Sequence, residues 1–349
     1  MLCIGPFSFD VPFVQAALSG YSDLPMRRLA RRHGAPYTLN EVMLDKLVLQ
    51  PGKKRKEMLY VAPDDHPVGG QLMGADPEVF GPAAFELAKA GYDIIDINFG
   101  CPVKKVLGRC RGGFLLSQPE TALSIVRSVI DAVGSIRPVT LKMRRGMDDS
   151  GTAERNFFEI LDGALAAGVK AVTVHGRTVQ QRYVGPSRWE FLKRVKLHVG
   201  DTVVLGSGDL FTAYDCLRMI EETGVDGVTI ARGCIGNPWI FEECRALWNG
   251  EELPAPPSIA RQRRAIESHW HDAVSVYGEE LAGKVMRKFG IKYAEHHPMD
   301  TEVKQAFIDV KNSAEFVAAM QCWYDLEREW PGVARREGPG DLVAAGACA

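Results

Sequence analysis

Short apolar runs alternate with segments of helical character along most of the chain, and this alternation restricts the possible folds more than any other feature. Such alternation is typical of a parallel α/β fold. Most of the runs end in a polar or glycine-rich segment, which suits a TIM (β/α)8 barrel better than an open sheet. The expected strands are Val11–Leu18, Tyr37–Glu41, Pro67–Leu72, Ile94–Ile97, Pro138–Lys142, Ala171–His175, Thr202–Leu205 and Gly227–Ala231.

The pattern changes after Gly250. Residues 251–257 form a proline-rich connector that cannot continue a helix. Helical periods without strand signals follow it, at Ser258–Tyr277, Glu279–Ala294, Asp300–Val310 and Ser313–Arg328. We therefore expect a barrel domain over residues 1–250, a helical bundle over 251–330 and a flexible tail over 331–349.

Composition excludes several classes of protein. A hydrophobic content of 46% with a formal net charge of −2 is ordinary for a globular protein and argues against a generally basic nucleic-acid binder. The eight cysteines contain no CxxC pair and no Cys/His cluster at metal-binding spacing, so no metal site is expected. The start of the chain does not resemble a signal peptide, and no apolar run is long enough to cross a membrane. We expect a cytoplasmic monomer.

The stretch Ile94–Leu116 carries the clearest chemical signal. An apolar run breaks at Asn98 into a glycine-rich loop that contains Cys101, Lys104 and Lys105. Barrel enzymes place their chemistry at such carboxyl ends of strands. A lone cysteine is usually core filler, but Cys101 lies in a polar loop beside cations that favour its thiolate, which indicates a functional thiol.

The ends of other strands suggest a phosphorylated cofactor. Ser207, Gly208 and Asp209 follow the seventh expected strand, and Ala231 and Arg232 follow the eighth. The loops after these two strands commonly form a phosphate site in barrels, although each taken alone is an ordinary turn. The other polar side chains expected at this mouth are Gln71, Asn98, Lys142 and His175, which suit a flavin ring.

Several long motifs, in order, resemble the tRNA-dihydrouridine synthases, flavin enzymes that reduce uridines in tRNA. They are SGYSDLPMRRLARRHGA, QLMGADPEVF, DINFGCPVKKV, LKMRRG, VHGRTVQQRYVGPSRW, GSGDLFTAYD and ARGCIGNPWIF. The resemblance covers nearly all of the first 250 residues and continues more loosely beyond them, where the tail weakly resembles the bacterial B type. It implies a barrel that binds FMN, NADPH as the reductant and a helical domain that grips tRNA.

The resemblance also assigns roles to residues. It implies that FMN N5 delivers hydride to C6 of a uracil while Cys101 protonates C5, with Asn98 at the flipped base or the flavin edge. Lys104 and Lys105 are expected to face RNA phosphates or NADPH. The positions that match FMN contacts are Ala17, Leu18, Ser19, Gln71, Lys142, His175, Ser207, Gly208, Asp209, Ala231 and Arg232.

The chain departs from the family pattern at three places. The family usually has Pro-Met-Ala at residues 17–19, Asn at Ser207 and Gly at Ala231. Contacts made by the backbone are expected to survive the first two changes. The Ala231 methyl would weaken FMN binding if the backbone there required a positive φ.

RNA binding would depend on local basic patches. Besides the Cys101 loop, these are the run Lys53–Lys56, expected on a loop, and the helical residues Arg261, Arg263, Arg264, Lys284, Arg287, Lys288 and Lys292. Charged helix faces are usually only solvated, and it is the family resemblance that favours an RNA contact.

Three other functions remain open at this point. A flavin barrel acting on a free pyrimidine would need neither the basic helical region nor the basic Cys101 loop. An RNA-binding protein without flavin would not need Gln71, Cys101, Lys142 and His175. An aldolase or isomerase with Lys142 as a Schiff-base amine would explain neither Cys101 nor Gln71.

Overall fold

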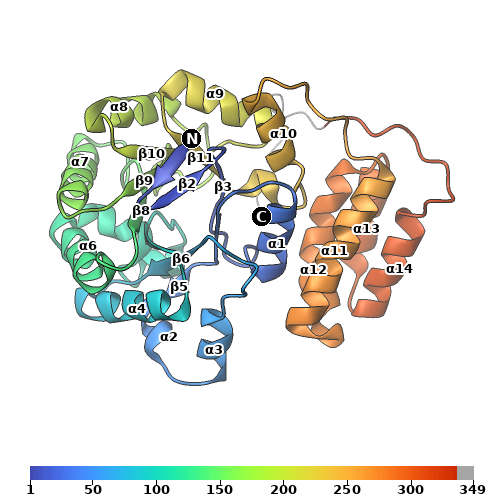
Figure 1. Ribbon diagram of the computed structural model, residues 1–349, viewed down its shortest axis with the longest axis horizontal. Coiled ribbons are helices and arrows are strands. Elements are labelled where there is room, and N and C mark those ends of the chain that lie inside the picture. The colour runs from blue at the N-terminus through green and yellow to red at the C-terminus, as the bar shows by residue number, and fades with distance from the viewer. Residues whose placement is uncertain (336–349) are drawn as a thin grey trace. The chain divides into compact units, whose positions relative to one another are not determined.

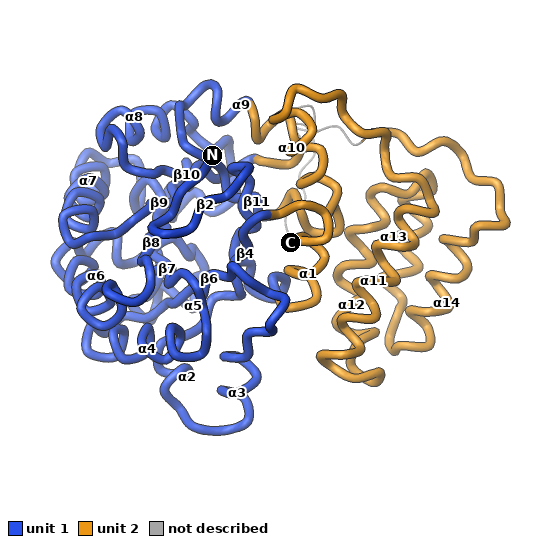
Figure 2. The backbone as a smooth tube through the Cα atoms, in the orientation of Figure 1, with its two compact units in different colours: residues 1–22, 36–209, 218–231 blue, residues 23–35, 210–217, 232–349 orange. Residues whose placement is uncertain are grey.

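The computed structural model describes residues 1–335 (Figure 1). Of the tail expected at 331–349, residues 336–349 lie outside the described residues. Internal contacts divide the chain into two compact units (Figure 2). Unit 1 comprises residues 1–22, 36–209 and 218–231, and unit 2 comprises residues 23–35 and 210–217 and the described chain from Arg232 onward.

Unit 1 is a closed parallel barrel, which confirms the predicted TIM fold. The strands pair in the order β4-β3-β11-β10-β9-β8-β7-β6-β5, and pairing of β4 with β6 closes the ring. β4 and β5 both pair with β6, so the ring has eight strand positions. The strands are β3 (Phe13–Gln15), β4 (Thr38–Leu39), β5 (Met43–Leu44), β6 (Val68–Met73), β7 (Ile94–Phe99), β8 (Val139–Arg144), β9 (Ala171–His175), β10 (Val203–Ser207) and β11 (Gly227–Ile230).

A hairpin of β1 (Leu2–Ile4) and β2 (Phe7–Phe9), which the sequence did not predict, covers one end of the barrel. Leu2, Ile4 and Phe9 belong to a buried cluster with Ile94 and Ala171, the first residues of β7 and β9. The hairpin therefore closes the amino end of the barrel with apolar side chains. Polar chemistry is left to the carboxyl end.

Helices cover the outside of the barrel in unit 1 (Figure 1). The side chain of Asp76 caps α4 by accepting from the Glu78 N–H. Contrary to expectation, Lys53–Lys56 do not lie on a loop, because the run opens α3 after Gly52. The helices are α2 (Asp45–Leu49), α3 (Lys53–Leu59), α4 (Pro77–Ala90), α5 (Lys104–Leu107), α6 (Pro119–Val133), α7 (Gly151–Ala166) and α8 (Trp189–Val199), with the short η1 (Gly112–Ser117); α9 (Ala213–Thr223) spans both units.

Unit 2 is helical and contains the expected C-terminal bundle. α1 packs on α11, and the hydroxyl of Tyr277 donates to Asp23 Oδ2 at 2.8 Å. Asp23 also caps α1 by accepting from the Met26 N–H. The helices of unit 2 are α1 (Leu24–Arg32), α10 (Ile240–Trp248), α11 (Ile259–Tyr277), α12 (Glu279–Tyr293), α13 (Asp300–Asp309), α14 (Ser313–Trp323), η2 (Arg232–Cys234) and η3 (Ala294–His296).

The last helix is shorter than expected. α14 ends at Trp323 rather than Arg328, because the Asp325 side chain accepts from the Glu327 N–H and turns the chain. Its start is as expected, with Asn312 accepting from the Glu315 N–H. Within the described residues, no helix combines the length and apolar character that crossing a membrane requires.

Candidate active site

The polar residues expected at the barrel mouth lie at neighbouring strand ends. Asn98 of β7 is paired in register with Lys142 of β8, and His175 of β9 is paired with Ser207 of β10. Because all of these strands are parallel, their carboxyl ends open on the same side of the barrel. The structure therefore brings these four side chains to one face of unit 1.

Asn98 organises the turn that carries Cys101. Its Oδ1 accepts from the backbone N–H groups of Gly100 and Cys101, at 2.9 and 3.1 Å. Its Nδ2 donates to Gln71 Oε1 at 2.6 Å. The buried amides of Asn98 and Gln71 thus link two adjacent strands to the backbone of the Cys101 turn. Two positions expected to contact ligand also hold the loop in place.

Cys101 is partly buried and is held as a thiol. Burial raises the pKa of its side chain, while the backbone at Val103 and the Arg144 guanidinium oppose that rise. The expectation that neighbouring cations favour the thiolate was therefore wrong. Lys104 and Lys105 are exposed on α5, and solvent screens their charge from the sulfur. A protonated thiol suits a general acid.

Lys142 lies inside the mouth rather than in solvent. Burial lowers the pKa of its amine to about 8, Asp96 favours the charged form and Arg144 opposes it. Its Nζ is 3.5 Å from Ser207 Oγ. Ser207, where the family usually has Asn, thus supplies a polar partner for the lysine.

The loop after β10 is shaped for close approach to its neighbours. Gly208 has a φ of +112°, and a Cβ built there would stand 2.4 Å from Ser187 Oγ and 3.2 Å from His175 Nε2. His175 Nδ1 accepts from the Arg177 N–H at 3.2 Å. A neutral His175 consequently carries its proton on Nε2, the nitrogen nearer Gly208. This arrangement places a donor beside the loop expected to bind phosphate.

Two arginines that the sequence did not single out fix the surrounding loops. Arg177 pairs with Asp209 at 2.7 Å and donates to the Gly185 carbonyl at 2.7 Å. Within the described residues its Nη1 is buried and has no hydrogen-bond partner. Arg144 donates to the carbonyls of Gly100 and Thr178, at 2.9 and 2.8 Å. Their positions within LKMRRG and VHGRT were visible in the sequence, but their hydrogen-bond partners were not.

Comparison with known proteins identifies the family. The family model described as dihydrouridine synthase (Dus) matches residues 14–328. The chain belongs to the dihydrouridine synthase family. It is 34% identical over 323 residues to a probable tRNA-dihydrouridine synthase of Mycobacterium tuberculosis strain CDC 1551, covering 90% of this chain and 82% of that protein. It is 33% identical over 333 residues to tRNA-dihydrouridine synthase B of Pseudomonas aeruginosa, covering 95% and 98%.

Solved structures support the fold independently. Morphinone reductase in complex with tetrahydroNAD matches with a TM-score of 0.54 at 14% identity, over 75% of this chain and 92% of that one. Histamine dehydrogenase from Rhizobium sp. 4-9 matches with a TM-score of 0.55 at 15% identity, over 76% and 50%. At such identities the likeness concerns the fold. The family itself consists of oxidoreductases, so this chain is an enzyme.

In this dihydrouridine synthase family member, residues 17–19, the first segment expected to contact FMN, lie in a loop. β3 ends at Gln15, three residues before the expected Leu18. The chain turns there because the Leu18 N–H donates to Ser22 Oγ at 2.8 Å and the Leu18 carbonyl accepts from Tyr21 and Ser22. Residues 17–19 therefore follow the carboxyl end of a strand, where backbone groups are available to a ligand.

The second segment, at Ala231 and Arg232, follows β11. Among the described residues, the non-glycine positions with positive φ are Cys110, Arg182 and Asp209. Ala231 is not one of them, so the condition under which its methyl would strain the backbone is not met. Arg232 opens η2 in unit 2, where its guanidinium lies 5.0 Å from the centre of the Phe211 ring.

Ion pairs reduce the positive charge of the basic patches that were expected to contact RNA. Arg261 pairs with Glu242 at 2.6 Å, and Arg263 pairs with Glu267 at 2.7 Å. Lys292 pairs with Glu295 in the same way. In unit 1, Lys53 and Arg55 pair with Glu57 and Glu86. The other cations expected in these patches are Lys54, Lys56, Lys104 and Lys105 in unit 1 and Arg264, Lys284, Arg287 and Lys288 in unit 2.

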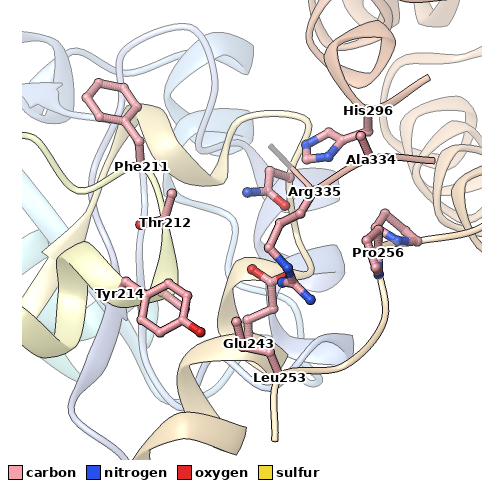
Figure 3. Close-up of a pocket in the computed structure, with 12 residues that line it drawn as sticks. Phe211, Thr212, Tyr214, Glu243, Leu253, Pro256, His296, Ala334 and Arg335 are labelled. Carbon is pink, nitrogen blue, oxygen red and sulfur yellow. The ribbon is translucent and has the colours of Figure 1, made fainter. Parts of the chain in front are cut away.

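A cavity of about 340 Å³ lies in unit 2 and contains none of the residues expected at the active site (Figure 3). Phe211 and Tyr214 line one side, and Arg335 lies beside Glu243 within it. Burial raises the pKa of Glu243, and Arg335 opposes this from 2.7 Å. The ion pair neutralises a partly buried carboxylate and attaches the end of the described chain to α10, which is a structural role.

Proposed function

We propose that this protein reduces uridines in tRNA to 5,6-dihydrouridine, with FMN as its flavin and NADPH as the reductant. The observation that carries the proposal is a partly buried thiol, Cys101, whose backbone is held at the carboxyl end of β7 by Asn98 and whose pKa burial raises. The relatives named as tRNA-dihydrouridine synthases, aligned over most of the chain, supply the substrate.

The donor set fits FMN. Gly208 leaves the loop after β10 open where a side chain would collide with Ser187. The cation of Arg177 keeps a buried N–H group without an acceptor in the described structure, as an anion site requires. His175 and the backbone of Ser207–Asp209 would hold the phosphate, and Ala231 and Arg232 would extend the site. Lys142 and Gln71 would hold the ring, together with backbone groups of Ala17, Leu18 and Ser19.

When bound, FMN supplies the hydride that reduces C6 of the base. Cys101 donates a proton to C5 of the same base, because burial keeps its sulfur protonated at neutral pH. Asn98 holds the backbone of Cys101 and keeps a second Nδ2 hydrogen for the base. Lys142 stabilises negative charge that develops beside it in the mouth of the barrel.

The uridine must leave its stack before it can reach this mouth. Lys104 and Lys105, exposed on α5 beside Cys101, would contact RNA phosphates. The helices of unit 2 would bind the body of the tRNA. We place the boundary between the catalytic and tRNA-binding regions at residue 250, and expect the enzyme to act in the cytoplasm as a monomer.

An absorbance experiment tests the proposal. The purified protein should show flavin bands that bleach when NADPH is added without oxygen and return with unmodified tRNA but not with free uridine. Cys101→Ala should still bleach, yet form no dihydrouridine. Cys110→Ala is the matched control, since Cys110 is an exposed thiol of the same loop, and it should behave like wild type.

Other outcomes would overturn the proposal. Recovery of the bands with a free pyrimidine would show a small-molecule reductase. A protein that shows no flavin bands after FMN is supplied would not be a flavoenzyme. Bleaching by NADH but not NADPH would contradict the proposed reductant alone.

A further inference from the structure

Four hydrogen bonds form an unbroken chain from the interior of the barrel to the Cys101 turn. Thr140 Oγ1 donates to Asp96 Oδ1 at 2.5 Å, and Gln71 Nε2 donates to Asp96 Oδ2 at 2.7 Å. Asn98 Nδ2 donates to Gln71 Oε1 at 2.6 Å, and the Cys101 N–H donates to Asn98 Oδ1 at 3.1 Å. Asp96, which the proposed mechanism does not use, is only 2% exposed.

The groups at the two ends of this hydrogen-bond chain fix which partner donates in each bond. Asp96 Oδ2 accepts a hydrogen bond whether or not Oδ1 carries a proton, and a backbone N–H can only donate. Between these ends lie two side-chain amides, Gln71 and Asn98, either of which could otherwise rotate by about 180° and exchange oxygen for nitrogen. Only one arrangement satisfies every group. It points the oxygen of Asn98 at the Cys101 turn.

We propose that Asp96 is a positioning residue for the proton donor Cys101, acting through the amides of Gln71 and Asn98. The inference rests on the proposed function only for the role of the thiol as an acid. Asp96 hydrogen-bonds Thr140 and Gln71 rather than the sulfur. Its contribution is to select the amide orientations that hold the turn.

Such an arrangement has a direct consequence for the reaction. A general acid must lie within hydrogen-bond reach of the atom it protonates. A displacement of about 1 Å in a reacting group can cost roughly 100-fold in rate. Without the fixed acceptor at Asp96, Gln71 and Asn98 can reorient, and the backbone of Cys101 loses its partner.

Four variants separate hydrogen bonding from charge. Asp96→Leu removes both acceptor oxygens and should disorder the turn. Asp96→Asn removes the charge but keeps one oxygen for Gln71, because its new NH₂ group can donate to Thr140 Oγ1. Thr140→Val leaves the Asp96 oxygen for Gln71 in place. The double variant Asp96→Asn/Thr140→Val leaves the new NH₂ group at position 96 without an acceptor. The new amide then has no preferred orientation, and the amides of Gln71 and Asn98 lose theirs.

The first measurement is alkylation of Cys101 by iodoacetamide, followed peptide by peptide with mass spectrometry. Asp96→Leu and the double variant should react about tenfold faster, the change in thiolate fraction that one pKa unit gives. Asp96→Asn and Thr140→Val should react within about twofold of wild type, a margin that corresponds to less than half a pKa unit. The exposed Cys3, on the hairpin at the other end of the barrel, should react equally in all of them.

The second measurement is dihydrouridine formation with saturating FMN and NADPH. Asp96→Leu should lose roughly 100-fold in the rate of tRNA reduction, while Asp96→Asn restores most of it. Wild-type rates in Asp96→Leu, or an Asp96→Asn variant as impaired as Asp96→Leu, would overturn the inference. Should Asp96→Leu not fold, the double variant Asp96→Asn/Thr140→Val provides the test. If the double variant behaved like the two single variants, the inference would be overturned. If the wild-type protein did not reduce tRNA, the proposed function would be overturned, but the alkylation test of the hydrogen-bond chain would remain valid.

Discussion

Nη2 of Arg177 lies 2.7 Å from one carboxylate oxygen of Asp209 and 2.8 Å from the other. Asp209 also accepts from the Ser187 N–H at 2.7 Å and has a φ of +58°. Asp209 is a negative residue in the loop proposed to bind phosphate, and its charge would repel that ligand. Arg177 neutralises the charge and holds the turn.

Replacing Arg177 should therefore weaken binding of the phosphorylated flavin selectively. In Arg177→Met, the uncompensated Asp209 carboxylate faces the phosphate of FMN but has nothing to repel in riboflavin. We expect the Kd for FMN to rise about tenfold, which corresponds to about 1.4 kcal/mol, and the Kd for riboflavin to stay within about twofold. Titration of flavin-free protein, followed by flavin fluorescence, measures both.

Arg194→Met is the matched control for this prediction. Arg194 pairs with Glu154 at 2.5 Å, but both side chains are nearly half exposed. Exposed ion pairs contribute little to stability. Equal losses of FMN and riboflavin affinity in Arg177→Met would show general damage to the barrel rather than a phosphate effect.

A methyl group at Gly208 should be costly for two separable reasons. Its φ of +112° strains any residue with a Cβ, and that Cβ would stand 2.4 Å from Ser187 Oγ. Gly168 has a similar φ of +107° but open space around it. We expect Gly168→Ala to lower the free energy of unfolding by about 1 kcal/mol and Gly208→Ala by about 2–3 kcal/mol. Urea denaturation measures both, and equal losses would contradict the close approach.

The strands and their polar ends were accessible from the sequence because each depends on local pattern. A buried parallel strand needs a continuous apolar run, and the residue after it reaches the barrel mouth. Asn98, Lys142, His175 and Ser207 could be placed on this basis alone. The β1–β2 hairpin was missed because its three-residue strands are too short to show a period.

The hydrogen-bond partners of individual side chains could not be predicted from the sequence in the same way. Asp96 lies two residues before Asn98, so both could be placed on one face of the strand. Its partner Gln71, however, is 25 residues away, and their contact depends on the register of β6 against β7. The signals in the sequence about the Cys101 thiol conflicted for a related reason, since Lys104 and Lys105 are close to it in sequence but exposed on α5. Burial of the sulfur outweighs them.

Restoring the glycine that the family usually has at position 231 should change little. The φ of Ala231 is not positive, so its methyl does not strain the backbone beside the proposed phosphate site. We expect Ala231→Gly to alter the Kd for FMN by less than about twofold and to lower the free energy of unfolding by about 0.5–1 kcal/mol, the entropic cost of glycine. Fluorescence titration and urea denaturation test this. A large gain in FMN affinity would show that the methyl obstructs the ligand.

Flavin affinity should fall as the pH rises through about 8. Burial lowers the pKa of Lys142 to about 8, so its amine is charged below that value and neutral above it. The charged amine donates stronger hydrogen bonds to the oxygen and nitrogen atoms of the flavin ring than the neutral amine does. The Kd for FMN should therefore rise by roughly tenfold between pH 7 and pH 9, an estimate that corresponds to about 1.4 kcal/mol. Lys142→Met should bind weakly at both pH values and show no such step, whereas Lys193→Met, at an exposed lysine of α8, should retain it. An unchanged pH profile in Lys142→Met would assign the titration to a different group.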